Sequence, residues 1–189
     1  MEALFQLLNS IYPMSKELSD YLNSVIKSLE LPKKEYLLKA GRVCENVYFI
    51  SKGLVRCFYA KDGVEVCNWF MKEGDVIFSV KSFYTQTPSN ESIQVLENAA
   101  FYYISYQELQ YIYKTFIEFN YIRGVLTERY YLLSEERIYS MRMQRAHERY
   151  NYIKENHAEL INRVPNKYIA SYLGITEETF SRIRAGKKY

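Results

Sequence analysis

Apolar residues recur with a helical period at both ends of the chain and with a strand-like texture in its middle. Residues 1 to about 30 carry apolar side chains three and four positions apart, as on one face of a helix. Pro13 interrupts this pattern, so two short helices are expected rather than one. From Pro32 to about Ser105, short runs rich in β-branched and aromatic residues follow, among them VYFIS, LVRCFYA and VEVCNWFM. This middle segment is predicted to form strands.

Turn signals divide the strand-forming segment at regular intervals. Glycines recur there every ten to twelve residues, and Lys61-Asp62-Gly63 fits a tight hairpin turn. Short strands with turns at this spacing indicate an antiparallel sandwich or barrel. The glycines are Gly41, Gly53, Gly63 and Gly74, and later strands are expected at Ile93–Leu96 and Phe101–Ser105, after a longer connection at 85–91.

Beyond Tyr106 the helical period returns and continues to about residue 139. Sustained over nearly four heptads, it predicts one long helix whose seam faces another helix, here that of a second copy of the chain. A second apolar face beside the seam could cover the β-domain at the same time. The alternative is that the seam packs only on its own β-domain. The seam comprises Leu109, Ile112, Phe116, Phe119, Leu126, Tyr130 and Leu133, and the second face Tyr111, Tyr113, Ile117, Tyr121, Ile122 and Val125.

The last twenty-five residues, Pro165 to Tyr189, have the features of two short helices joined by a tight turn. Gly174 lies where such a turn needs a residue that tolerates a positive φ. Thr176 can cap the second helix, and Ala170 is small enough to let the helices cross closely. A generic helix pair does not need these residue types at these positions. The segment therefore predicts a DNA-binding helix-turn-helix, preceded by a further helix from Ser140 to Leu160.

The positive charge of the chain is concentrated in the same C-terminal part. Residues 140–189 contain ten basic and five acidic residues, a net charge of +5, which leaves −2 for residues 1–139 out of a total of +3. Neutralising DNA phosphates requires an excess of Lys and Arg, although many solvated helices also have one. The charge distribution supports nucleic-acid binding and does not establish it.

Composition argues against several other classes of protein. No apolar run is long enough to span a membrane and no signal peptide is evident, so a cytoplasmic location is expected. The cysteines, Cys44, Cys57 and Cys67, are odd in number and lack the spacing of a metal site, which favours free buried thiols. The histidines, His147 and His157, both lie outside the β-rich segment. An enzyme is therefore not expected, and no catalytic or metal-binding residue is assigned.

Short helices, a β-roll, a long helix and a helix-turn-helix, in this order, resemble the Crp/Fnr family of bacterial transcription regulators. The most specific pieces are AGRVCENVYFISKGLVRCFYAKDGVEV, similar to the family's β-roll turns, and KYIASYLGITEETFSRIR, similar to its DNA-reading segment. The resemblance implies an α+β fold, a homodimer, effector control of two DNA-reading heads, and RNA polymerase as a partner. It implies a cyclic-nucleotide-binding-like sensor domain at 1–139, with an antiparallel, jelly-roll-like β-roll (a double-stranded β-helix) at about 32–105 and a dimerisation helix at about 106–139, followed by a small all-α helix-turn-helix domain at 140–189.

One departure from the family concerns the cyclic nucleotide. Relatives that bind it hold its ribose and phosphate with a Gly-Glu pair and an Arg-Ser pair, where this chain has Phe78-Ser79 and Glu91-Ser92. No arginine lies between Arg56 and Arg123. A buried phosphate needs a bidentate cationic partner, and a glutamate would repel it. No cofactor is therefore expected, and cAMP in particular is not.

One interpretation of the roll is that it holds a different, unidentified small-molecule effector, for example an apolar one. The alternative is that the aromatic side chains of the roll only fill its interior. Iron–sulfur sensing is not expected, since no cysteine precedes Cys44, and haem sensing is not expected without a histidine in the sensor domain. The candidate effector-pocket residues are Trp69, Phe70, Phe78, Ser79, Phe83, Glu91 and Ser92.

Mapped on the family's DNA-reading segment, Glu177, Glu178 and Arg182 face the bases. Arg182 can donate two hydrogen bonds to guanine, and a carboxylate can accept one from cytosine N4. The alternative role of the two glutamates is favourable charge at the start of a helix. The candidates for phosphate contacts, which position the domain without reading sequence, are Asn166, Lys167, Thr179, Ser181, Arg184, Lys187 and Lys188.

These features predict a homodimeric, sequence-specific transcription regulator that binds half-sites about one helical turn apart. The alternative is an effector-sensing β-roll protein with vestigial DNA binding that acts through protein partners. In most relatives a longer helix and a β-hairpin wing follow the recognition helix, and the sequence up to Tyr189 has room for neither, either naturally or because the chain was cut. Without the wing's phosphate contacts, lower DNA affinity and a shallower salt dependence are expected.

Overall fold

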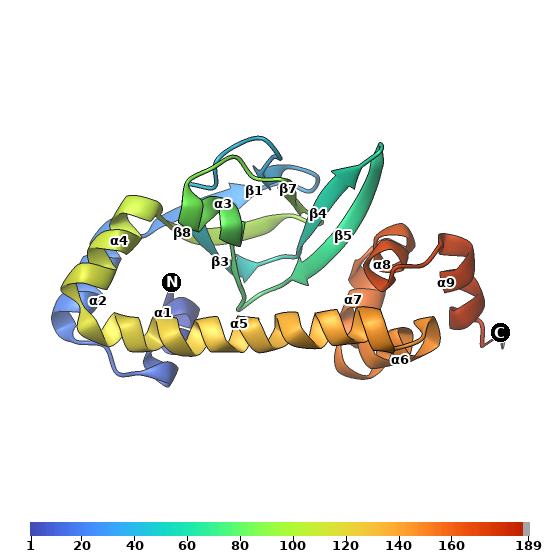
Figure 1. Cartoon of the computed structure of the whole chain (residues 1–189). Coiled ribbons are helices and arrows are strands. Elements are labelled where there is room, and N and C mark those ends of the chain that lie inside the picture. Colours follow the sequence, from blue (N-terminus) through green and yellow to red (C-terminus); the bar gives the residue numbers. More distant parts are fainter. Residues whose placement is uncertain (187–189) are drawn as a thin grey trace. The chain divides into compact units, whose positions relative to one another are not determined.

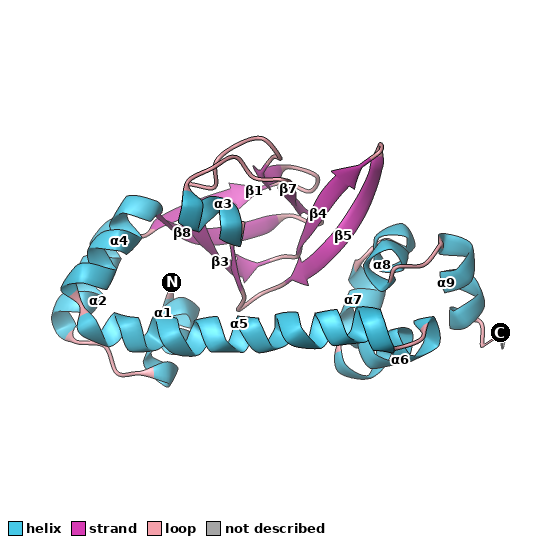
Figure 2. Ribbon diagram, in the orientation of Figure 1, coloured by secondary structure: helices cyan, strands magenta, loops and turns pink. Residues whose placement is uncertain are grey.

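The computed structural model describes residues 1–186 and contains a β-roll with helices before and after it (Figure 1, Figure 2). The strands are β1 (Lys27–Leu31), β2 (Tyr36–Leu38), β3 (Asn46–Lys52), β4 (Val55–Lys61), β5 (Val64–Met71), β6 (Val76–Ile77), β7 (Glu91–Val95) and β8 (Ala99–Ser105). They form two four-stranded sheets, in the orders β1-β8-β3-β6 and β2-β7-β4-β5. The pairs of β8 with β1 and β3, and of β2 with β7, are antiparallel. The predicted α+β class with an antiparallel β-roll is confirmed.

The helices lie at both ends of the chain, with one short helix inside the roll. Pro13 falls in the break between the first two, as predicted, and the Ser15 hydroxyl caps the second by accepting the Leu18 N–H. The helices are α1 (Glu2–Ile11), α2 (Lys16–Val25), α3 (Val80–Thr85), α4 (Tyr106–Thr115), α5 (Ile117–Met143), α6 (Ala146–Asn156), α7 (Ala158–Arg163), α8 (Asn166–Leu173) and α9 (Glu177–Arg184).

The β4–β5 hairpin has the turn that its sequence predicts. Asp62 and Gly63 both have positive φ, of 52° and 77°, as a two-residue type I′ turn requires. The predicted strands at Ile93–Leu96 and Phe101–Ser105 are present as β7 and β8, with bounds that differ by no more than two residues. The three cysteines are free and buried, as predicted.

The chain divides into two compact units. The first combines Met1–Cys57 with Phe70–Arg129, and the second combines Phe58–Trp69 with the chain from Tyr130 onward. This grouping places the outer part of the β4–β5 hairpin with the C-terminal helices, which the predicted domains, 1–139 and 140–189, did not include. Within residues 1–186, no helix is both long and apolar enough to cross a membrane.

The prediction of one helix over about 106–139 is wrong, because the helix is interrupted at Phe116. This residue has extended backbone angles, φ −115° and ψ 97°, and its ring lies 5.7 Å from that of Tyr21. Ser105 and Glu108 form a capping box that starts α4, and α5 begins at Ile117. Packing of Phe116 against α2 thus accompanies a bend that the hydrophobic period does not reveal.

The front part of the predicted seam is buried within the first unit. Leu109, Ile112 and Phe119 are each less than 10% exposed, and Ile122 from the second predicted face is fully buried. These residues pack on their own domain, as the alternative interpretation of the seam expected. Ile117, in contrast, is 85% exposed. Ile117 and the exposed Tyr121 belong to the second predicted face, whereas the later seam residues Leu126, Tyr130 and Leu133 are half-buried.

Candidate nucleic-acid interface

Helices α8 and α9 are joined by a tight turn at Gly174, as the sequence predicts. Gly174 has φ 66°, a left-handed backbone angle that favours glycine, and the flexible end of the Met141 side chain lies beside it. Thr176 caps α9, since its Oγ1 accepts the Thr179 N–H at 3.1 Å. The predicted helices, turn and cap are confirmed.

A compact apolar core holds the α8–α9 pair against α6. Ile169, Ala170 and Leu173 of α8 are at most 1% exposed, and so is Phe180 of α9. The Phe180 ring meets that of Tyr150 edge to face, with centroids 5.7 Å apart. The small side chain at Ala170 lies fully inside this core, as the close crossing of two helices requires. The outward faces of α8 and α9 are thus left for polar residues.

The three candidate base-reading residues are exposed on one helix. Glu177, Glu178 and Arg182 all belong to α9 and all face solvent. Arg182 Nη2 donates to Glu178 Oε1 in an i, i+4 ion pair whose side chains are 56% and 73% exposed. At that exposure the pair adds little stability, so both groups can exchange this contact for others. On α9, the carboxylate and the guanidinium could replace their ion pair with hydrogen bonds to base edges.

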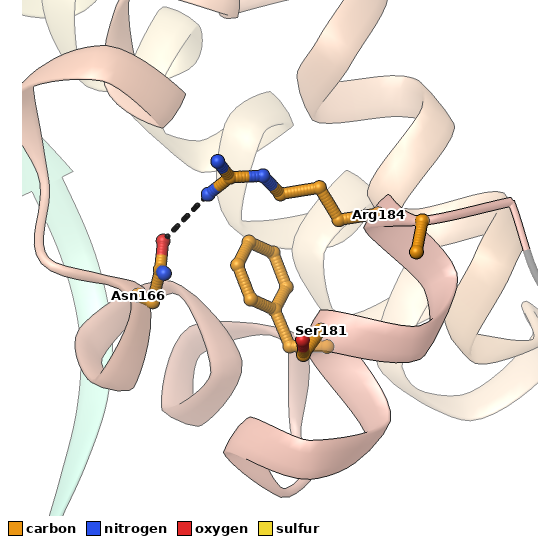
Figure 3. Close-up of a pocket in the computed structure, with 5 residues that line it drawn as sticks. Asn166, Ser181 and Arg184 are labelled. Carbon is orange, nitrogen blue, oxygen red and sulfur yellow. Dashed lines mark hydrogen bonds between the residues drawn. The ribbon is translucent and has the colours of Figure 1, made fainter.

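Three of the candidate phosphate-contact residues line one small pocket. Asn166, Ser181 and Arg184 line a pocket of about 310 Å³ together with Phe180 and Ala185 (Figure 3). Arg184 Nη1 donates to Asn166 Oδ1 at 3.2 Å, which orients the guanidinium between the start of α8 and the end of α9. A hydroxyl, an amide and a guanidinium offer an oxyanion several hydrogen-bond donors here.

The other candidate phosphate contacts do not join this pocket. The ammonium of Lys167 lies 4.8 Å from the Tyr168 ring centroid. The Thr179 hydroxyl accepts a hydrogen bond from Thr176 at 3.1 Å, so it takes part in the helix cap. Lys187 and Lys188 lie outside the described residues.

Sequence reasoning missed the contacts that hold the opposite end of α8. Ser171 is bonded to the β4–β5 hairpin, accepting the Cys67 N–H at 2.9 Å and donating to the Glu65 carbonyl at 3.1 Å. Arg137 and Arg149 donate to backbone carbonyls in the last turn of the same helix. No local signal marks these residues, because each contact joins segments that are far apart in the sequence.

In the β-roll, the polar candidates for an effector pocket are bonded to their own chain. The Ser79 hydroxyl lies 3.0 Å from that of Ser89, and the Ser92 hydroxyl accepts the Ala40 N–H at 3.0 Å. The Cys44 sulfur accepts the Ser79 N–H at 3.4 Å, and burial raises the pKa of this thiol. The N–H and hydroxyl of Ser79 and the hydroxyl of Ser92 thus already have hydrogen-bond partners within the protein.

The aromatic candidates are divided between the two units. Phe83 is fully buried, and its ring lies 5.0 Å from Phe78 and 5.3 Å from Tyr106, both edge to face. Such packing is what a structural role of these rings predicts. Phe70 lies in the same unit on β5, whereas Trp69 belongs to the second unit. Glu91 begins β7 and is half-buried.

Comparisons with known proteins agree with this description of the fold. Residues 28–116 match the family model of the cyclic nucleotide-binding domain. Comparison with curated protein sequences gives no match. The β-roll is thus of the cyclic-nucleotide-binding type. Phe78-Ser79 and Glu91-Ser92 nevertheless stand where a Gly-Glu pair and an Arg-Ser pair would be expected to hold a cyclic nucleotide.

Solved structures extend the similarity into the helices after the roll. The chain is similar to a protein from Eubacterium rectale described as a Crp/Fnr family regulator, with 12% identity, 96% of this chain and 86% of that one covered, and a TM-score of 0.76. It is similar to FixK2 from Bradyrhizobium japonicum (18% identity, 86% and 84% covered, TM-score 0.71) and to the c-di-GMP responsive regulator CLP from Xanthomonas campestris (14%, 91% and 91%, TM-score 0.71). At these identities the likeness establishes the fold.

Proposed function

We propose that the protein is a homodimeric, sequence-specific DNA-binding transcription regulator of the Crp/Fnr type, controlled by an effector other than cAMP. The observation that carries this proposal is the outward face of the α8–α9 pair. The candidate base-reading side chains are exposed along α9, at both its start and its end, and Asn166, Ser181 and Arg184 line one pocket. In a helix-turn-helix, the second helix enters the major groove while its surroundings contact phosphates.

The proposed dimer uses the exposed apolar side chains of α5. A helix surface of this kind favours burial against a partner, and a second copy of the chain gives the two-fold symmetry of a pseudo-palindromic DNA site. RNA polymerase is proposed as a further partner from the family resemblance alone. The exposed large apolar residues of α5 are Ile117, Tyr121, Tyr131, Leu132, Ile138, Tyr139, Met141 and Met143.

Selection from random DNA tests this function. Purified protein should enrich a pseudo-palindromic site with half-sites about one helical turn apart. In mobility-shift titrations the selected duplex should bind at least about a thousandfold more tightly than a scrambled duplex at the same salt concentration. Sedimentation of the same sample should give a dimer.

The control duplex carries one intact half-site and one scrambled half-site. It should bind more weakly than the full site, since only one head of the dimer then reads bases. Equal affinity for all three duplexes would contradict the proposed function. It would favour the alternative, a sensing β-roll protein that acts through protein partners.

A further inference from the structure

Three consecutive residues at the end of α8 are each held by a different element of the C-terminal unit. Ser171 is bonded to the β4–β5 hairpin, as described above. The backbone carbonyl of Tyr172 accepts a hydrogen bond from Arg137 of α5, and that of Leu173 accepts one from Arg149 of α6 at 2.9 Å. The last turn of α8 is therefore hydrogen-bonded to the β4–β5 hairpin, to α5 and to α6.

Arg137 makes two contacts with one residue. Its guanidinium carbon lies 3.7 Å from the centroid of the Tyr172 ring, while Nη2 donates to the carbonyl of the same Tyr172. The last carbonyls of a helix lack intrahelical partners and carry the negative end of the helix dipole. A planar guanidinium can stack and donate at the same time, which an ammonium group does less well. Arg137 thus fixes both the end of α8 and a side chain on it.

Electrostatics show that Arg137 is held there against opposing effects. Burial lowers the pKa of Arg137, and the nearby cation of Arg149 lowers it further, while Tyr172 acts in the opposite direction. An arginine on a solvated surface would avoid both of these unfavourable effects. The stack on Tyr172 and the hydrogen bond to its carbonyl therefore offset the desolvation of the Arg137 guanidinium and its repulsion by Arg149.

Arg149 also bonds the end of α8 to the connection between α5 and α6. Its Nε donates to the Leu173 carbonyl, and its Nη1 donates to the Gln144 carbonyl at 2.5 Å. One guanidinium thus links the end of α8 to the residue after α5. On the same side, the terminal methyl group of Met141 of α5 lies beside the turn, 2.8 Å from where a Cβ atom of residue 174 would stand. Contacts from α5, α6 and the β4–β5 hairpin thus converge on the last turn of α8.

We propose that Arg137 is a positioning residue that holds the α8–α9 pair in one orientation on α5 and so sets the half-site spacing that a dimer accepts. This inference rests on the proposed function. If two copies join along α5, the orientation of each α8–α9 pair on its own α5 decides where the two α9 helices lie. If this orientation is fixed before binding, the α8–α9 pairs do not lose orientational entropy when they bind DNA, and the affinity is higher.

The test compares spacing preference in three variants. The probes are the selected duplex, the same duplex with two base pairs inserted between its half-sites, and a single half-site. The insertion rotates one half-site by about 70° and moves it by about 7 Å, so the wild type should lose at least about tenfold in affinity. Arg137→Ala and Arg137→Lys should bind the selected duplex more weakly and lose less than about threefold on insertion. Their single half-site affinity should match that of the wild type.

Arg142→Ala is the matched control, because Arg142 is an exposed arginine on the same helix. It should keep the full penalty for the insertion. Arg137→Lys preserves the charge and the long aliphatic stem, so it guards against loss of the fold, which circular dichroism checks. A folded Arg137 variant with the wild-type insertion penalty would overturn the inference.

A second measurement does not use DNA. Amide residual dipolar couplings of α8 and α9 should fit one fixed orientation relative to the C-terminal half of α5 in the wild type and in Arg142→Ala. In Arg137→Ala they should shrink uniformly, as expected of a pair that reorients as a body. A wild type that binds no selected site would overturn the proposed function, and the couplings would still decide whether Arg137 fixes the pair. Unchanged couplings in Arg137→Ala would refute its positioning role.

Discussion

The β-roll has a set of polar side chains buried in its interior, whereas the α8–α9 pair has its candidate ligand-binding side chains at the surface. In the roll, Arg56, Ser79 and Gln94 are less than 10% exposed and are bonded to neighbouring groups of the protein. In the α8–α9 pair, Ser181 and Arg184 stand at the surface beside a pocket. The roll also has exposed polar residues such as Lys27, Lys52 and Lys61, but the polar groups in its interior are bonded within the protein.

This difference bears on what each region can bind. A group that already has its partners inside a protein gains little by exchanging them for a ligand, whereas an exposed donor gives up only water. The roll has the fold of a cyclic nucleotide-binding domain, yet its polar groups stabilise the roll itself. Similarity of fold therefore does not decide which ligand the interior of the roll can bind. The hydrogen bonds that its polar side chains already make restrict the choice of ligand.

The largest effect is expected where the inward network of the roll is broken. Arg56 Nε and Nη2 both donate to Gln94 Oε1, at 2.9 and 2.6 Å, and both residues are buried. Gln94→Leu removes this acceptor from a buried cation and should lower the free energy of unfolding by about 3 kcal/mol. Urea denaturation measures this loss.

Gln107→Leu is the matched control, because Gln107 is an exposed glutamine on α4. It should change the stability by less than about 0.5 kcal/mol. Equal effects of the two substitutions would show that the buried network does not hold the roll together.

The sequence predicts the α8–α9 pair well because its determinants are local. Gly174 is needed by its own backbone angle, and Thr176 caps the helix that it precedes. The hairpin turn at Asp62-Gly63 is predictable for the same reason. Such signals depend on a few neighbouring residues, so they survive without knowledge of the tertiary structure.

What the sequence did not predict depends on distant partners. The break at Phe116 falls where its ring meets Tyr21, and the hydrophobic period runs through it unchanged. Arg149 counted as one more basic residue of the C-terminal part, but its guanidinium is bonded to two backbone carbonyls. Charge counts cannot separate such an arginine from the exposed Arg184, because the difference lies in the fold around each side chain.

An intermediate effect is expected at the outward face of α9. Arg182→Ala should weaken binding of the selected DNA site by about 1–3 kcal/mol and relax the preference at one base pair. Arg184→Ala should weaken binding to all duplexes alike and lower the slope of log K against log salt by about 0.9, as for a lost phosphate contact. Mobility-shift titrations over a range of salt concentrations distinguish the two.

The pair of substitutions is its own control, since both remove an exposed arginine from the same helix. Equal losses for Arg182→Ala on specific and random DNA would contradict base reading. A base-specific loss for Arg184→Ala would exchange the two roles.

The smallest effect is expected from cAMP, since the roll has no evident partner for its phosphate at the expected positions. Glu91 stands at the start of β7, and Ser79 and Ser92 already have hydrogen-bond partners. A ligand with a Kd near 10 μM would, at about 1 mM, stabilise the fold by about 2.7 kcal/mol and raise Tm by several degrees. We expect no measurable shift with cAMP in differential scanning calorimetry. A rise of about 4 °C or more would contradict this and would mean that the inward hydrogen bonds of the roll open to admit a phosphate.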